Sequence, residues 1–195
     1  MKKLLSILAV ISCLTITNAG AQIKLPAAST TQTIKQEFGM GSIEITYSRP
    51  GAKGRNVFGD LVPYGKLWRT GANAATSLRF TSPVEIGGKK LDSGTYILYT
   101  IPYEDNWEVI LNKGLKNWGV DGYKETEDVV RFKVPAIKIK TKIETLTMQI
   151  ANVKADTCHL EIMWEKRGID ITITADINEK LKSQFDAAML TDKKP

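Results

Sequence analysis

The sequence is poor in the residues that build metal centres, disulfides and nucleophilic active sites. Its 195 residues include one histidine, His159, and two cysteines, Cys13 and Cys158. A single histidine cannot form a histidine-rich metal site, so we expect no metal and no cofactor. No serine or cysteine stands in a context typical of a catalytic nucleophile, which favours a protein that is not an enzyme.

The two rare side chains of the main body fit ordinary structural roles. Cys158 alternates with Leu160 and Trp164, which predicts a small buried thiol. His159 is out of phase with them and should face away from that side of the core. A reactive thiol and a lone acid–base histidine are the alternatives. If the N-terminal segment is removed, Cys158 is the only cysteine left and no intrachain disulfide can form.

Long apolar runs are also lacking, except near the N-terminus. Residues 4–16 are apolar but shorter than the about 20 residues that span a bilayer, so we expect no transmembrane segment. Two lysines precede this run and the small residues 19–21 follow it, as in a cleaved signal. We predict that residues 1–21 are a signal peptide and that 22–195 are exported, to the periplasm or outside a bacterial cell. A lipoprotein signal ending at Cys13 is the less favoured alternative.

The excess of basic over acidic residues is small. The full chain carries a formal charge of +6, and loss of the two lysines in the predicted signal peptide takes 27 basic residues to 25, against 21 acidic, for +4. Nucleic-acid binding would need a basic face with stacking or base-reading groups. We therefore expect no nucleic-acid partner.

Short segments that alternate apolar and polar residues fill most of the chain, with turn signals between them. This period is typical of half-buried strands, and many short strands of this kind indicate an antiparallel sandwich or barrel. We predict a single all-β domain, mainly an antiparallel β-sandwich. The predicted strands are 31–38, 42–48, 76–82, 84–86, 89–91, 95–102, 107–112, 129–134, 136–142, 144–154, 158–164 and 169–173, with a turn at Lys166–Gly168.

The period changes near the C-terminus. Ile177, Leu181, Phe185 and Met189 recur every four residues, with charged residues between them. This spacing predicts a short amphipathic α-helix over about 177–190.

The connection between the predicted strands that contain Tyr47 and Phe80 is long and rich in glycine and arginine. A long loop in a compact domain is usually functional or disordered, and the apolar residues of this one favour an ordered loop. Guanidinium groups bind carboxylate, phosphate and sulfate, so we predict a site for a small anionic ligand or glycan within residues 49–73. The candidate ligand-binding residues are Arg49, Arg55, Tyr64, Trp68, Arg69 and Asn73.

Other interpretations of the same residues stay open. The arginines can pair with Asp60, Glu44 or loop carbonyls and only lock the loop, and Trp68 can be a core residue. A glycan hydrolase of the cell envelope would use Asp60 with a carboxylate from the second long loop, 113–128. A structural or interaction protein would use the first loop or the terminal helix to dock a protein partner, which the sequence does not identify.

Six short motifs stand out along the chain. They are YSRP (Tyr47–Pro50), GRNVFG (Gly54–Gly59), LVPYG (Leu61–Gly65), WRTGANAAT (Trp68–Thr76), GTY (Gly94–Tyr96) and WEVILN (Trp107–Asn112). Together they resemble the domain of unknown function 2911 family of secreted, Bacteroidetes-type bacterial proteins. The resemblance covers roughly Ser29 to Asp176 and implies a mainly β-sandwich domain and export. It implies no reaction and no catalytic residues.

Overall fold

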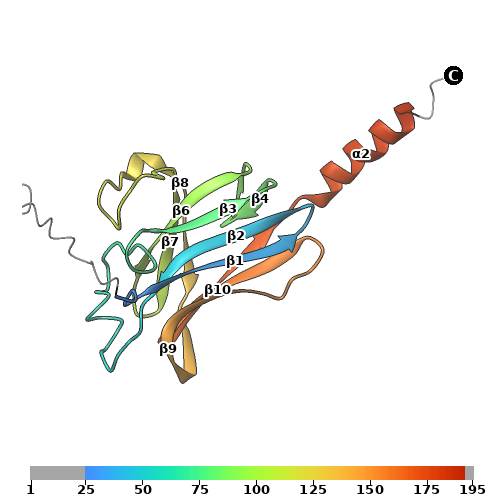
Figure 1. The fold of residues 1–195 in the computed structure, drawn as a ribbon. Helices are drawn as coiled ribbons and strands as arrows, with labels where there is room; N and C mark the ends of the chain where they lie inside the picture. Colours follow the sequence, from blue (N-terminus) through green and yellow to red (C-terminus); the bar gives the residue numbers. More distant parts are fainter. Residues whose placement is uncertain (1–24, 192–195) are drawn as a thin grey trace, which may run out of the picture.

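The computed structural model describes residues 25–191 as two packed antiparallel β-sheets followed by one α-helix (Figure 1). The six-stranded sheet contains, in spatial order, β1 (Thr30–Phe38), β2 (Gly41–Arg49), β3 (Thr76–Phe80), β6 (Gly94–Pro102), β7 (Asn106–Asn112) and β8 (Asp128–Pro135). The four-stranded sheet contains β5 (Lys89–Leu91), β4 (Val84–Ile86), β10 (Thr157–Thr174) and β9 (Ile137–Ala151). The helical elements are η1 (Glu125–Glu127) and α2 (Ile177–Thr191). This confirms the predicted fold class; the predicted signal peptide lies outside the described residues.

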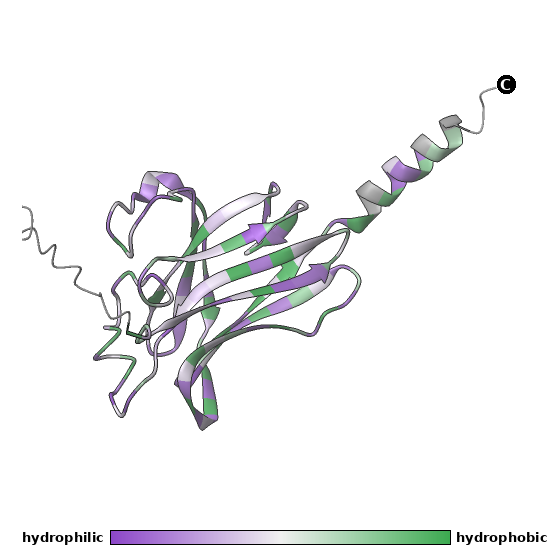
Figure 2. Cartoon of the chain, viewed as in Figure 1, coloured by the Kyte–Doolittle hydropathy of each residue, from purple (hydrophilic) through white to green (hydrophobic). Residues whose placement is uncertain are grey.

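The core lies between the two sheets and follows the alternation of the sequence. In β2, Ile43, Ile45 and Tyr47 are buried while their neighbours are more exposed. In β10, Cys158 and Trp164 are buried on the inner face in the same way. Figure 2 shows the resulting change between apolar and polar positions along the strands. The buried position predicted for Cys158 is confirmed, and burial raises the pKa of its thiol to about 11.

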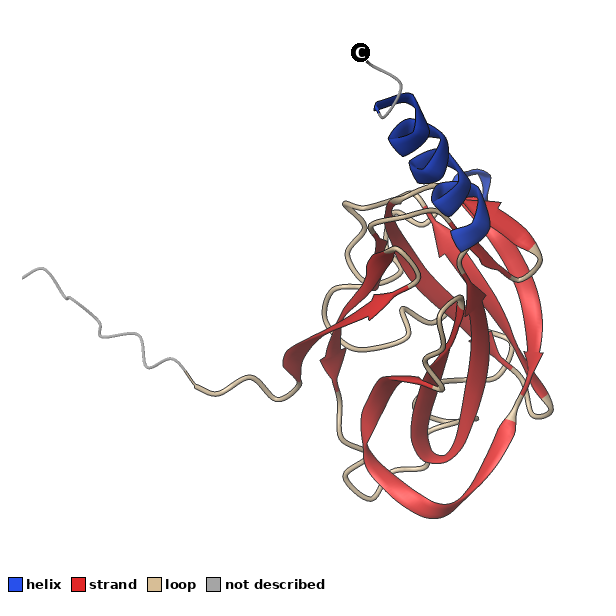
Figure 3. Ribbon diagram, turned by 90° about the vertical axis from the view of Figure 1, so that its right-hand side faces the viewer, coloured by secondary structure: helices blue, strands red, loops and turns tan. Residues whose placement is uncertain are grey.

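β10 doubles back on itself where the sequence predicts a turn. The hydrogen-bonded strand is continuous, but the backbone NH of Ala175 donates to the carbonyl of Asp156 over 2.8 Å, so the two ends of β10 lie side by side. Glu165 has a φ of 53°, and the pairing with β9 shifts register on both sides of it. The bend therefore consists of two bulges within one long element. Figure 3 shows how sharply these strands curve.

β9 is one strand, although the sequence predicts two separate strands here, 136–142 and 144–154. It runs without interruption from Ile137 to Ala151. Ile137, its first residue, is 46% exposed and lies outside the core.

The predicted C-terminal helix is confirmed, but its apolar stripe faces solvent. α2 projects away from the sandwich (Figures 1 and 3), and Leu181, Phe185 and Met189 are 39%, 69% and 66% exposed. No helix among residues 25–191 is long and apolar enough to cross a membrane.

The first long loop, residues 50–75, is ordered because backbone hydrogen bonds fix it to both sheets. Near its start, the NH of Ala52 donates to the carbonyl of Glu144 in β9 over 2.7 Å. Near its middle, Trp68 and Thr100 of β6 exchange two backbone hydrogen bonds of 2.8 and 3.0 Å. Since such bonds restrict the backbone, the side chains of this loop are held in fixed positions.

Candidate functional site

An open cleft of about 480 Å³ lies between the first long loop and the second long loop, residues 113–127. Both loops are at the end of the sandwich opposite to α2 (Figure 1). We call it the loop cleft. It is lined by Ser29, Pro50, Arg55, Leu61, Val62, Trp68, Arg69, Gly71, Ala72, Asn73, Trp118 and Trp164. Four of the six candidate residues therefore meet here: Arg55, Trp68, Arg69 and Asn73.

Arg55 and Arg69 are oriented by neutral carbonyl groups. Arg55 donates through Nε to the carbonyl of Ala52 over 2.9 Å and through Nη2 to that of Gly51 over 2.8 Å. Arg69 donates through Nη1 to the carbonyl of Asn73 over 2.8 Å. Within residues 25–191, neither guanidinium has a carboxylate within 4 Å. The loop thus holds two positive charges in place without neutralising them, which leaves further N–H donors for an anion.

Arg49 and Tyr64 lie elsewhere. Arg49 reaches across to β9, where Nε donates to the carbonyl of Leu146 and Nη2 to the hydroxyl of Thr147, both over 3.1 Å. It joins the two sheets and does not line the loop cleft. The ring of Tyr64 packs against Gly59 and faces a different cleft, described below.

Trp68 forms the floor of the cleft as part of the core. The residue is 8% exposed, and its Nε1 donates to the carbonyl of Gly71 over 3.1 Å. It stacks on Trp164 with ring centroids 6.0 Å apart and meets Trp107 edge-on. The core interpretation of Trp68 therefore fits this arrangement, and a rigid aromatic base supports the arginines above it.

The sequence interpretation missed Trp118 and Gly119 of the second loop. Trp118 lines the cleft and is 63% exposed, although tryptophan is usually well buried. Gly119 has a φ of 64°, and a Cβ placed on it would lie 2.7 Å from Nη1 of Arg69. The sequence feature that could have indicated this part of the site is the pair of aromatic residues, Trp118 and Tyr123, among the glycines of that loop.

Unusual backbone conformations occur in the part of the first long loop that lines the loop cleft. Thr70, which follows Arg69, has a φ of 53°, and Asn73 has a φ of 57°. Positive φ is a genuine outlier for a β-branched residue, and such strain is common at binding sites. The hydroxyl of Thr70 is buried against that of Thr100 at 3.1 Å, which helps to hold the conformation.

Carboxylates are missing from the lining of the loop cleft in the part of the chain that the structure describes. Asp60 is exposed and does not line it. In the second loop region, Asp128 is bound by Arg131 at 2.9 Å and by Tyr123 at 2.8 Å. The loop cleft therefore gives no support to the hydrolase alternative, which needs two carboxyl groups facing one substrate.

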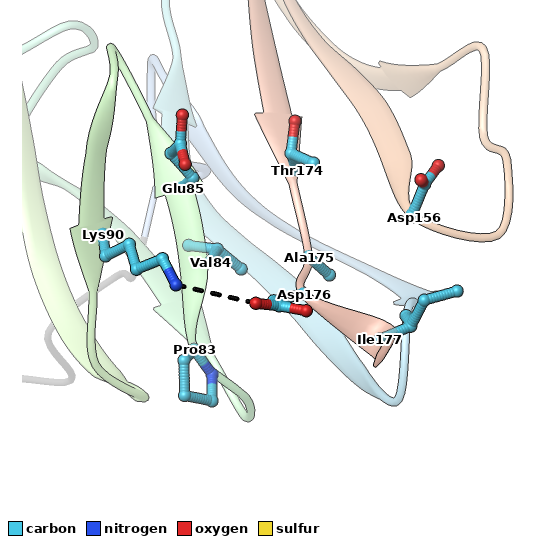
Figure 4. Close-up of a pocket in the computed structure, with 9 residues that line it drawn as sticks. All are labelled: Pro83, Val84, Glu85, Lys90, Asp156, Thr174, Ala175, Asp176 and Ile177. Atoms are coloured by element: carbon cyan, nitrogen blue, oxygen red, sulfur yellow. Dashed lines mark ion pairs between the residues drawn. The ribbon is translucent and has the colours of Figure 1, made fainter. Parts of the chain in front are cut away.

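A smaller cleft of about 290 Å³ lies at the opposite end, where β10 continues into α2 (Figure 4). Its lining contains Glu85, Asp156 and Asp176, and Lys90 lies 3.6 Å from Asp176. Charges of both signs are present here, so this cleft lacks the uniform positive character of the loop cleft.

The fold and the loop cleft together define an all-β sandwich domain with a basic cleft built on two long loops. Residues 29–173 match the model of a family described as "Protein of unknown function (DUF2911)". This match covers most of the chain, so the chain belongs to that family, as its motifs predict. Comparisons with curated proteins and with solved structures gave no match.

Proposed function

We propose that this protein is an exported, non-catalytic binding module that holds an anionic group of a glycan in the loop cleft. The observation that carries the proposal is the pair of oriented guanidinium groups, Arg55 and Arg69, with no carboxylate partner among the described residues. An anion bound here would gain charge-assisted hydrogen bonds without first displacing an internal salt bridge.

Trp118 supports a glycan as the carrier of that anionic group. Its exposed indole borders the same cleft as the two arginines. An aromatic face offers apolar contact area to a sugar ring at little cost in side-chain entropy. Export rests on the predicted signal peptide, residues 1–21, which lie outside the described residues.

Thermal unfolding with and without ligand tests the proposal. The probes are oligosaccharides that contain uronic acid or sulfate, with neutral oligosaccharides of the same length as controls. We expect acidic probes to raise the unfolding temperature of the wild type and to have no effect on Arg69→Ala. The matched control is Arg79→Ala, because Arg79 is an exposed arginine of β3 that does not line the cleft.

Two results would overturn the proposal. One is equal stabilisation of the wild type and Arg69→Ala by acidic probes. The other is an Arg69→Ala protein that fails to fold, since Arg69 would then be a structural residue of the loop.

An interaction role is a second candidate, favoured by the exposed apolar stripe of α2. Leu181, Phe185 and Met189 form this stripe and lie outside the core. A docking helix would show self-association in light scattering, or capture of an envelope protein that is lost in Phe185→Ser. A monomer that captures nothing would exclude this candidate.

A further inference from the structure

A second basic cleft lies on the other side of the loop segment that ends at Tyr64. It has a volume of about 460 Å³ and lies where β9 and β10 bend, so we call it the bend cleft. Arg55, Leu61 and Val62 face the loop cleft, whereas Tyr64 faces the bend cleft. The bend cleft is lined by Asn56, Phe58, Tyr64, Lys138, Ile139, Lys140, Glu165, Lys166 and Arg167.

Positive charge dominates this lining. Lys138, Lys140, Lys166 and Arg167 face one carboxylate, Glu165. Within residues 25–191, none of the four cations lies within 4 Å of a carboxylate. Among the described residues, Nη1 of Arg167 donates a hydrogen bond to the carbonyl of Glu104 over 2.6 Å. The carboxylate of Glu165 meanwhile accepts from the backbone NH of Val57 over 3.4 Å.

The register of the two strands makes this arrangement costly for the fold. Arg167 of β10 lies directly opposite Lys138 of β9. Like charges directly opposite each other on neighbouring strands destabilise a sheet. Lysines on an edge strand such as β9 can protect it from edge-to-edge pairing, but Lys166 and Arg167 belong to β10, which is an inner strand. Edge protection therefore does not explain the cluster.

We propose that the bend cleft is a second binding site, separate from the loop cleft, for a linear polysaccharide that carries repeated sulfate or carboxylate groups. The volume exceeds that of one oxyanion and has room for sugar units. Its cations come from two strands, which suits charges spaced along a chain. The ammonium groups of lysines are point charges on flexible side chains, so they can bind sulfate or carboxylate groups in variable positions. The half-buried ring of Tyr64 gives one apolar contact.

Fluorescence anisotropy with labelled dextran sulfate fragments tests this site, with unsulfated dextran of the same length as the neutral probe. We expect Lys138→Gln/Lys140→Gln to weaken binding about tenfold, because two charge-assisted contacts are lost. The control Lys35→Gln/Lys89→Gln removes the same charge from β1 and β5 and should change the dissociation constant less than about twofold. Lys166→Gln, at an exposed position, is a second variant should the first not fold.

The loop-cleft variant Arg69→Ala separates the two sites. Dextran sulfate binding by Arg69→Ala at wild-type strength supports a separate bend site, whatever the outcome for the loop cleft. Equal weakening of dextran sulfate binding by Lys138→Gln/Lys140→Gln and by the control Lys35→Gln/Lys89→Gln would overturn the proposal, because the attraction would then depend only on the overall charge. A third result would favour a membrane surface as the partner and would also overturn the proposal. This result is tighter binding to vesicles of anionic phospholipid than to dextran sulfate, with the vesicle binding lost in Lys138→Gln/Lys140→Gln.

Discussion

Arginines serve opposite purposes in the first long loop and in β8, which follows the second long loop. In β8, Arg131 lies 2.9 Å from Asp128, 3.1 Å from Glu108 and 3.6 Å from Glu125. At the first loop, Arg55 and Arg69 contact only carbonyl groups among the described partners of their guanidinium nitrogens. Carboxylates neutralise an arginine and make it part of the framework, whereas carbonyls orient it and leave its charge in place. The difference separates structural arginines from candidate binding arginines.

Removal of the neutralised arginine should have the largest effect on folding. Arg131→Met leaves Asp128, whose side chain is 10% exposed, and Glu108, 17% exposed, without their shared cation. Breaking a buried ion pair from one side is strongly destabilising, so we expect a loss of about 3 kcal/mol in the free energy of unfolding. Urea unfolding measures it. A loss below about 1 kcal/mol would show that Arg131 is not a structural arginine, which would contradict the contrast with Arg55 and Arg69.

Gly119→Ala should disturb the contact between the two loops. The added Cβ meets the guanidinium of Arg69, and φ at this position is 64°. We expect a loss of about 1–2 kcal/mol, seen as a fall of a few degrees in unfolding temperature. Binding of acidic oligosaccharides should weaken as well. The control is Gly54→Ala, which also has positive φ but has no atom near its added Cβ, so it carries the backbone strain alone.

Tyr123 should make the second loop sensitive to alkaline pH. Burial and the hydrogen bond to Asp128 raise the pKa of Tyr123 above its ordinary value. A phenol with a higher pKa in the folded state binds its proton more tightly there, so its contribution is complete below about pH 10 and is lost as the pH rises further. Tyr123→Phe should cost about 1 kcal/mol at pH 7 and lose less stability than the wild type between pH 9 and 11. Parallel decline of both proteins in urea unfolding would contradict this.

Arg55→Met should have the smallest effect on folding. It removes two hydrogen bonds from an exposed side chain to the carbonyls of Ala52 and Gly51, and the Ala52 carbonyl still accepts from the backbone NH of Arg55 over 3.0 Å. We expect a change of about 0.5 kcal/mol in urea unfolding, with loss of acidic-oligosaccharide binding. A loss of stability comparable to that of Arg131→Met would instead place Arg55 in the framework.

Local pattern predicted the strands well because alternation reports which face of a strand is buried. It also predicted a turn at Lys166–Gly168, close to where β10 doubles back. It could not predict that this bend lies within one continuous strand with bulges on both sides of Glu165, since the bulges depend on pairing with β9. For the cleft, composition identified the arginine-rich loop, but Arg49 and Arg69 look equivalent in sequence. Only tertiary packing sends Arg49 across to β9 and brings Trp118 from another loop to the same cleft.

The position of α2 has a practical consequence for measurement. The helix leaves the sandwich at the end remote from both long loops (Figure 1). A biosensor chip that captures the protein through this helix would therefore present the arginine-bearing end to the flowing solution. The same geometry would let a cell-surface anchor and a soluble ligand occupy one molecule simultaneously.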